Sequence, residues 1–224
     1  MLLDLDGTLL DTAPDLATVT NMLREQEHLA PLAFECLRPH VSHGSIALLR
    51  VAFPDADRAR VTALQRRLLA LYRDNLAVET QLFPGFAQVL TALEAHGIPW
   101  GVITNKPGWL TEPLMRHFGL YERAACVLSG DSLPVSKPDP LPLLTAARTI
   151  GVTPQRCLYL GDALRDVQAA RAANMVALAA RYGYVGPLDE PADWPVTAWI
   201  DTPLEVLEWV GLDASAPSRA GAEG

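Results

Sequence analysis

Two carboxylates near the start of the chain have the spacing of an acid pair that can act on one reacting group. Asp4 and Asp6 lie two positions apart, directly after the apolar residues 1–3 and before Gly7, which favours a tight turn. A carboxylate can attack phosphorus and divide one difficult step into two easier ones. The second carboxylate can protonate the leaving oxygen and later activate water. The pair therefore suits phosphoryl transfer, in which Asp4 could attack phosphorus and Asp6 could act as general acid and base.

Other polar side chains that suit this chemistry follow apolar runs further along the chain. Magnesium prefers oxygen ligands, needs only a few from the protein and keeps several waters. Asp4, Asp162 and the backbone carbonyl of Asp6 could supply these oxygens. Lys137 and the Thr104 hydroxyl could hold phosphate oxygens and offset the charge that develops in the transition state. The sequence thus predicts a Mg²⁺ cofactor and a small phosphorylated metabolite as substrate.

Short apolar runs separated by amphipathic stretches are the elements that would position these groups. This alternation indicates βαβ units and a parallel sheet, in which ligands bind beyond the carboxyl ends of the strands. Asp4, Thr104, Asn105 and Asp162 all follow such runs, so we expect them at one edge of the sheet. The predicted strands are residues 1–3, 100–104, 125–130, 157–161, 175–180 and 198–200.

Residues 13–81 interrupt the alternation and are predicted to form an inserted helical cap. Their apolar residues have helical spacing, but they contain no convincing strand. We therefore predict an α/β fold whose Rossmann-like catalytic core consists of residues 1–12 and 82–212, with the cap domain between these two parts. Residues 213–224 are small and polar and contain Pro and Gly, so we expect a disordered tail.

Composition and charge argue against several other functions. The 224-residue chain is half hydrophobic, which is enough for a buried core, and has a net charge of −8 without a basic stripe. Such a chain is a poor candidate for nucleic-acid binding, and no apolar run reaches the roughly 18 residues of a membrane span. The three cysteines match neither a disulfide framework nor a zinc site, and the acidic start does not resemble a signal peptide. We expect a cytoplasmic protein without nucleic-acid or membrane partners, and the oligomeric state stays open.

Four segments resemble, in order and spacing, the motifs of the haloacid dehalogenase (HAD) superfamily. They are DLDGTLLDT from Asp4, ITNK from Ile103, SKPDP from Ser136 and GDALRD from Gly161. The match looks closest to the branch of phosphoglycolate phosphatase-like proteins with a helical cap. Within that branch, the stretch RYGYVGPLDEPADW at 181–194 is similar to bacterial N-acetylmuramic acid 6-phosphate phosphatases.

The resemblance implies a role for each matching residue in a phosphoric monoester hydrolase. Asp4 would be the nucleophile and Asp6 the acid and base, while Asp166 would support the metal site from outside the ligand set. The magnesium ligands would be Asp4, Asp6 and Asp162. The phosphate-binding residues would be Thr104, Asn105 and Lys137. Phosphoglycolate and N-acetylmuramic acid 6-phosphate are both implied as substrates, and the residues do not decide between them.

The start of the chain departs from the family pattern. Members of the superfamily usually have a longer apolar strand before the first Asp, whereas only Met1 and Leu2 precede Leu3 here. This is short against a typical strand of about 5–6 residues. The pattern leaves open whether the native N-terminus lies upstream of Met1.

Substrate selection must come from groups that reach beyond the phosphate, and we expect these groups in the cap. Both suspected substrates carry a carboxylate, which a cationic or donor side chain could hold. The candidates are Arg38, His40 and His43, close to Gly44 and Ser45. A solvated loop is an equally good interpretation of this segment.

Three other functions use similar residues. A dehalogenase of the same superfamily would need neither Asp6 nor the metal-binding GDALRD segment, so the sequence argues against it. A sugar phosphomutase would keep every core motif and differ only in the cap. A phospho-accepting signalling module, which belongs to a different class, also combines acids, a Thr and a Lys on a parallel sheet, but it needs no cap.

Overall fold

A parallel sheet of six strands forms the centre of the computed structural model, which describes residues 1–186 and 189–212. The predicted disordered tail lies outside these residues. The strand order is β5-β4-β1-β6-β7-β8, and every neighbouring pair is parallel, so the predicted α/β fold is confirmed. The strands are β1 (Leu2–Leu3), β4 (Gly101–Ile103), β5 (Cys126–Leu128), β6 (Leu158–Gly161), β7 (Val176–Ala180) and β8 (Ala198–Ile200).

The shortest of these strands lies in the middle of the sheet. Leu2 and Leu3 pair with β4 on one side and with β6 on the other, and both side chains are fully buried. The chain adds β4 and β5 on one side of β1 and later β6, β7 and β8 on the other. The strand order therefore reverses at β1, and such reversal points open a crevice at the carboxyl ends of the strands.

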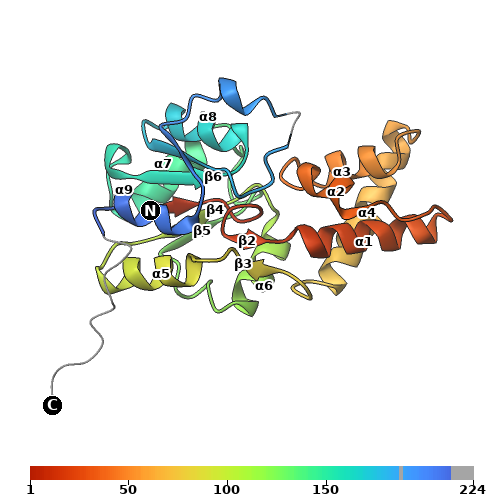
Figure 1. Ribbon diagram of the computed structural model, residues 1–224, viewed down its shortest axis with the longest axis horizontal. Helices are drawn as coiled ribbons and strands as arrows, with labels where there is room; N and C mark the ends of the chain where they lie inside the picture. The colour runs from red at the N-terminus through yellow and green to blue at the C-terminus, as the bar shows by residue number, and fades with distance from the viewer. Residues whose placement is uncertain (187–188, 213–224) are drawn as a thin grey trace, which may run out of the picture.

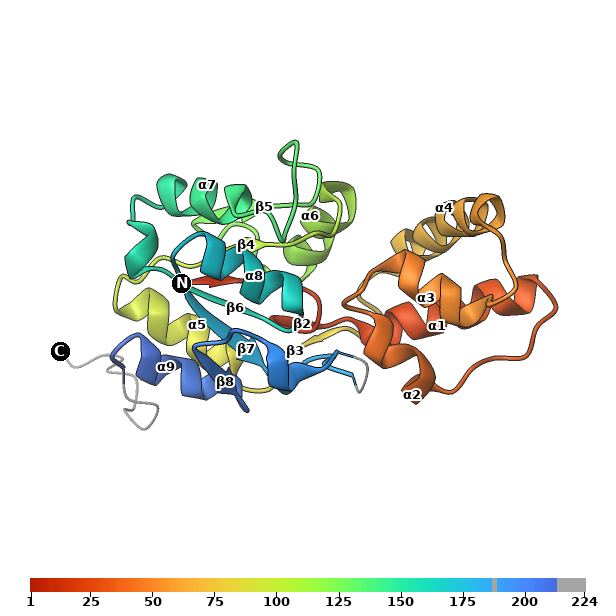
Figure 2. The same cartoon turned by 90° about the horizontal axis from the view of Figure 1, so that it is seen from above.

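Helices cover both faces of the sheet because the apolar strand residues alternate in direction (Figure 2). Leu3, Val102 and Leu160 share one buried cluster with α5 and α9, whereas Leu2 and Tyr159 share another with α7 and α8. The helices of this part are α5 (Phe86–Ala95), α6 (Gly108–His117), α7 (Leu141–Thr149), η2 (Pro154–Arg156), α8 (Leu164–Ala172), η3 (Pro191–Asp193), η4 (Pro203–Glu205) and α9 (Val206–Trp209).

A helical segment lies beside the carboxyl edge of the sheet, away from the covering helices (Figure 1). It begins with the Pro-containing first turn of α1, and the Asp57 side chain caps α4 by accepting a hydrogen bond from Arg60 N at 2.7 Å. Its elements are α1 (Ala13–Gln26), α2 (Phe34–Leu37), η1 (Arg38–His40), α3 (Ser45–Ala52) and α4 (Arg58–Asp74). This arrangement agrees with the predicted inserted cap, whose boundaries stay a prediction.

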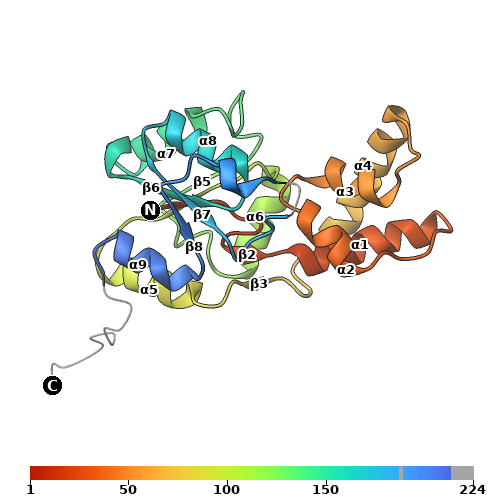
Figure 3. The ribbon, with the colours of Figure 1, turned by 45° about the horizontal axis from the view of Figure 1, so that its top comes forward.

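Two short strands that the sequence analysis missed connect the helical segment to the sheet (Figure 3). β2 (Leu10–Asp11) pairs antiparallel with β3 (Gln81–Leu82). The segment that leads from the core into the helical segment therefore lies beside the segment that leads back. The buried Asp15 carboxylate stabilises this crossing. It accepts hydrogen bonds from the backbone N–H groups of Val78, Glu79 and Thr80 and from the Thr80 hydroxyl at 2.5–3.2 Å.

No helix among the described residues combines the length and the apolar character that a membrane crossing requires.

Candidate active site

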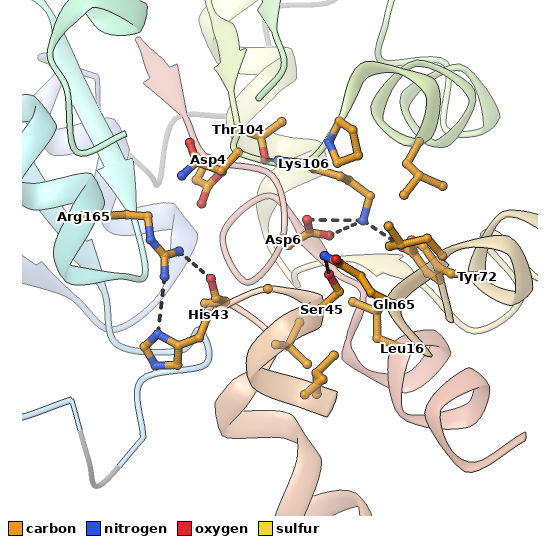
Figure 4. A pocket seen from close by; sticks show the side chains of 18 residues that line it. Asp4, Asp6, Leu16, His43, Ser45, Gln65, Tyr72, Thr104, Lys106 and Arg165 are labelled. Carbon is orange, nitrogen blue, oxygen red and sulfur yellow. Dashed lines mark hydrogen bonds and ion pairs between the residues drawn. The ribbon is translucent and has the colours of Figure 1, made fainter. Parts of the chain in front are cut away.

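A pocket of about 350 Å³ lies between the carboxyl edge of the sheet and the helical segment (Figure 4). From the core it is lined by Asp4 and Asp6 after β1, and by Thr104 after β4. From the helical segment it is lined by residues of α1, α3 and α4, including Leu16 and Tyr72. The structure therefore brings the sequence-predicted acids and threonine to one place, as the topology of a parallel sheet requires.

Three buried carboxylates lie close together at the site, and Asp4 is the one of them that lines the pocket. Asp4, Asp162 and Asp166 each offer a carboxylate oxygen within 4.8 Å of the others. Burial raises the pKa of Asp4 to about 6, although the charge of Lys137 acts against this. Burial and the neighbouring Asp4 raise the pKa of Asp162 to about 7. A divalent cation would relieve the repulsion between these acids, so the residues fit a hard metal with oxygen ligands.

Lys137 supplies the positive charge at the base of the site. Its Nζ lies 2.9 Å from Asp4 Oδ1 and 2.7 Å from Asp166 Oδ1, and it donates to the Tyr159 hydroxyl at 2.7 Å. Burial would lower the pKa of Lys137, but Asp166 and Asp4 outweigh this and raise it. Lys137 is therefore a protonated, fully buried cation whose position is set by three partners.

The Asn105 side chain holds the backbone of Lys137. Its Oδ1 accepts a hydrogen bond from Lys137 N at 3.1 Å, and its Nδ2 donates to Lys137 O at 2.9 Å. Both ends of the amide are thus used within the protein, although the residue lines the pocket. This geometry makes Asn105 a clamp on the loop that carries Lys137. The second N–H of Nδ2 is not used in these two bonds, so the predicted phosphate contact stays a prediction.

Both carboxylate oxygens of Asp166 contact other groups of the protein. Its Oδ2 accepts a hydrogen bond from Ala163 N at 3.0 Å, and its Oδ1 is the oxygen that contacts Lys137. Its exposed fraction is 0 %. Since both oxygens already have partners, the geometry agrees with a supporting role next to the metal ligands.

Asp6 lies apart from the three-carboxylate cluster and has its own partners. Its Oδ1 accepts a hydrogen bond from the Thr12 hydroxyl at 2.6 Å and lies 2.9 Å from Lys106 Nζ. Lys106 also donates to the Tyr72 hydroxyl at 3.0 Å, which connects the core to α4 of the helical segment. The Asp6 side chain is thus oriented by Thr12 and by Lys106, and Lys106 is in turn held by Tyr72.

The Asp162 carboxylate is reached from the loop between η1 and α3. The Ser42 hydroxyl donates to Asp162 Oδ2 at 2.5 Å, and the backbone N–H of Tyr184 donates to the same oxygen at 2.9 Å. The backbone of Gly7 also lies close against the Asp162 carboxylate, and only a residue without a side chain fits there. Gly7 has φ +79°, and a Cβ atom at this position would lie 2.1 Å from Asp162 Oδ2.

Only one of the three predicted cap residues reaches the pocket. His43 lines it, whereas Arg38 donates to the Tyr182 carbonyl at 3.2 Å and packs over the Tyr184 ring. His40 lines a different, neighbouring cavity. Neither Arg38 nor His40 lines the pocket that Asp4 lines, and the substrate contact predicted for them stays a prediction.

The sequence analysis did not identify four residues that shape the site. Arg165 and Lys106 lie inside the quoted motifs GDALRD and ITNK, so a closer look at the motif positions could have found them. Tyr159 lies in the middle of a predicted buried strand, where a lone polar tip among apolar residues was the available signal. Ser42 carried no signal, because its contact with Asp162 joins segments 120 positions apart.

The family model of haloacid dehalogenase-like hydrolases matches residues 1–174. The chain is 41% identical over 203 residues to a phosphoglycolate phosphatase of Xylella fastidiosa, covering 91% of this chain and 89% of that protein. It is 39% identical over 209 residues to an N-acetylmuramic acid 6-phosphate phosphatase of Pseudomonas aeruginosa, covering 93% and 92%. The chain therefore belongs to the haloacid dehalogenase-like hydrolases.

Solved structures agree with this assignment. A crystal structure of a predicted phosphoglycolate phosphatase from Haemophilus somnus superimposes with a TM-score of 0.81 at 26% identity, covering 93% of this chain and 96% of that one. The curated relatives are phosphatases. Within its family, the chain is accordingly a phosphoric monoester hydrolase.

Proposed function

We propose that the protein is a Mg²⁺-dependent phosphomonoesterase that acts on a small phosphorylated carboxylic acid through a phospho-aspartate on Asp4. The observation that carries this proposal is the environment of Asp4, which lies beside Lys137, Asp162 and Asp166 at the base of the pocket. Relatives named for phosphoglycolate and for N-acetylmuramic acid 6-phosphate suggest the two candidate substrates. The pocket volume of about 350 Å³ is within the roughly 300–1,000 Å³ of small-molecule sites.

In this mechanism the two oxygens of Asp4 have different tasks. Lys137 and the backbone N–H of Leu5 both contact Oδ1, at 2.9 and 2.8 Å, and no described residue donates a hydrogen bond to Oδ2. Oδ2 is therefore the oxygen free to attack phosphorus. The new Oδ2–P bond forms as the ester P–O bond breaks, and the electron pair of that bond goes to the leaving alcohol.

Asp6 would supply the proton that the leaving oxygen needs, and it would then accept one from the water that hydrolyses the phospho-aspartate. One Asp6 oxygen must exchange its Lys106 contact for the substrate during this transfer. The Thr104 hydroxyl would hold one phosphate oxygen, and Lys137 would hold another by exchanging one of its three present contacts. Mg²⁺ held by Asp4, Asp162 and the Asp6 carbonyl would offset the negative charge of phosphate and carboxylates.

The variant Asp4→Asn tests this proposal, since an amide cannot attack phosphorus. We expect it to abolish steady-state hydrolysis of both candidate esters, while its far-UV circular dichroism stays that of the wild type. A verified Asp4→Asn protein that still turns over either ester would refute the role of Asp4. Side-by-side kcat/KM values of the wild type with both esters and Mg²⁺ would identify the preferred substrate.

A further inference from the structure

One cation in the pocket has no acidic partner. Two lining residues carry a fixed positive charge, Lys106 and Arg165, and Lys106 is paired with Asp6. The first turn of α8 carries Arg165, which forms no ion pair with any carboxylate of the described residues. Among the described residues its hydrogen-bond partners are the Ser42 carbonyl and the His43 ring, and neither is a carboxylate.

These contacts leave part of the guanidinium available. Arginine has five N–H donors in a rigid fork. Nη1 donates to Ser42 O and Nη2 contacts His43 Nδ1 at 3.3 Å (Figure 4). These two contacts use two of the five N–H groups, and the other three have no partner among the described residues. A carboxylate is the group that accepts two parallel N–H bonds from such a fork. An unneutralised guanidinium on a pocket wall thus fits a substrate that carries a carboxylate besides its phosphate.

Both ring nitrogens of His43 already have a partner within the protein. Its Nε2 lies 2.8 Å from Asp189 Oδ1, and a carboxylate can only accept, so Nε2 carries the hydrogen. Its Nδ1 faces the Arg165 donor and therefore accepts. Asp189 is held in turn by the backbone N–H of Gly186 at 2.5 Å. The ring thus has no donor left for a substrate carboxylate and instead fixes the orientation of Arg165.

We propose that Arg165 binds the carboxylate of the phosphate-ester substrate and that His43, oriented by Asp189, positions Arg165. This inference rests on the proposed phosphatase function and adds the residue that selects among its esters. It assigns the recognising cation to the catalytic core and only the positioning residue to the helical segment. The enzyme would then bind esters whose leaving group carries a negative charge more tightly than esters with a neutral leaving group.

Matched pairs of esters test the inference. Phosphoglycolate differs from phosphoglycolamide only in its carboxylate, and N-acetylmuramic acid 6-phosphate differs from N-acetylglucosamine 6-phosphate in its carboxylate-bearing lactyl group. The measured quantity is the ratio of kcat/KM values within each pair, with Mg²⁺ present. We expect Arg165→Met to lower this ratio by about tenfold or more for the pair that contains the preferred substrate, mainly through KM, as the loss of a charge-assisted hydrogen bond predicts. Arg165→Lys, which keeps the charge without the fork, should lower it by less.

Arg171→Met is the matched control. Arg171 is exposed on the last turn of the same helix and lines neither pocket, so the ratio should stay at the wild-type value. Equal losses on the charged and the neutral ester in both Arg165 variants would overturn the proposal and show that Arg165 only holds the Ser42–His43 loop. A wild type that hydrolyses none of the esters would instead refute the proposed function.

A double-mutant cycle tests the positioning role of His43. His43→Ala should lower the charged-to-neutral ratio in the wild type and should lower it no further in Arg165→Met, because the two residues act through one contact. A further loss of similar size in the Arg165→Met background would show that His43 contacts the carboxylate by itself. Asp189→Asn should reproduce the His43→Ala pattern in the wild type and in Arg165→Met. Additive losses in these two backgrounds would show that Asp189 does not act through Arg165.

Discussion

Asp6 and Lys106 form an ion pair in which Lys106 Nζ lies 2.9 Å from Asp6 Oδ1. The Lys106 side chain is only 6 % exposed, and its ammonium also donates to the Tyr72 hydroxyl. The pair therefore connects the proposed acid and base of the core to α4 of the helical segment.

Replacing this cation should affect both stability and turnover. Lys106→Met leaves Asp6 without its charged partner, so we expect the free energy of unfolding to fall by about 3 kcal/mol. We expect kcat to fall by about tenfold or more, because Asp6 keeps only its Thr12 contact. Tyr72→Phe is the control that removes one neutral hydrogen bond and should cost about 1 kcal/mol. Urea unfolding and steady-state kinetics measure both effects, and equal losses in the two variants would contradict the importance of the Asp6 pair.

The Asn105 clamp predicts a change in the loop that carries Lys137. Asn105→Ala leaves the N–H and C=O groups of Lys137 without their side-chain partners, which should cost about 1–3 kcal/mol of unfolding free energy. Because Lys137 is then less well placed against Asp4, kcat/KM should fall by about tenfold. Asn105→Asp keeps the acceptor but puts a carboxylate against the Lys137 carbonyl, so it should not rescue activity. Normal stability with a loss confined to phosphate binding would instead support the direct phosphate contact.

Removal of magnesium should have a pH-dependent effect on thermal stability. Asp4 and Asp162 have pKa values of about 6 and about 7 in the folded protein, against 3.8 in the unfolded chain. The metal-free folded state therefore binds these two protons more tightly than the unfolded chain does. The contribution of the protonated carboxyls to the free energy of unfolding is lost as the pH rises from about 4 through 7. Metal binding requires the ionised carboxylates, so it strengthens over the same range.

The expected result is a Mg²⁺-induced increase in Tm that is larger at pH 8 than at pH 5. At a hundredfold excess over Kd the stabilisation is about 2.7 kcal/mol, or roughly 5–10 °C for a chain of this size. Differential scanning fluorimetry with and without EDTA measures the increase. Asp162→Asn should abolish most of it, and an equal increase at both pH values would argue against these carboxylates as the ligands.

Asp15 should be the most sensitive position of the crossing between the core and the helical segment. Its carboxylate accepts hydrogen bonds from Val78, Glu79 and Thr80, and Asp15→Asn would turn an amide N–H group towards these donors. We expect the free energy of unfolding to fall by about 3 kcal/mol, since hydrogen bonds to charged groups are worth about 1.5–3 kcal/mol each. Asp57→Ala removes only the exposed cap of α4 and should cost about 1 kcal/mol. Chemical denaturation of both variants provides the comparison, and similar costs would contradict a special role for Asp15.

Much of the core could be predicted from local sequence patterns. The six strands of the central sheet coincide with short apolar runs, because strands buried on both faces need apolar residues at every position. Asp4, Thr104 and Asp162 were expected together because parallel strands end at the same edge. The β2–β3 pair was missed, since two strands of two residues each carry no periodicity.

The sequence by itself thus determined the chemistry of the site, whereas the tertiary structure decided which side chains face the substrate. Arg38, His40 and His43 were equal candidates in sequence, and only His43 reaches the pocket, where both of its nitrogens are occupied. The recognising role is proposed for Arg165 because α8 begins at the pocket and no described acid neutralises this residue. Such roles depend on the directions of side chains from segments more than 100 positions apart. Packing sets these directions, and no local pattern of residue types encodes them.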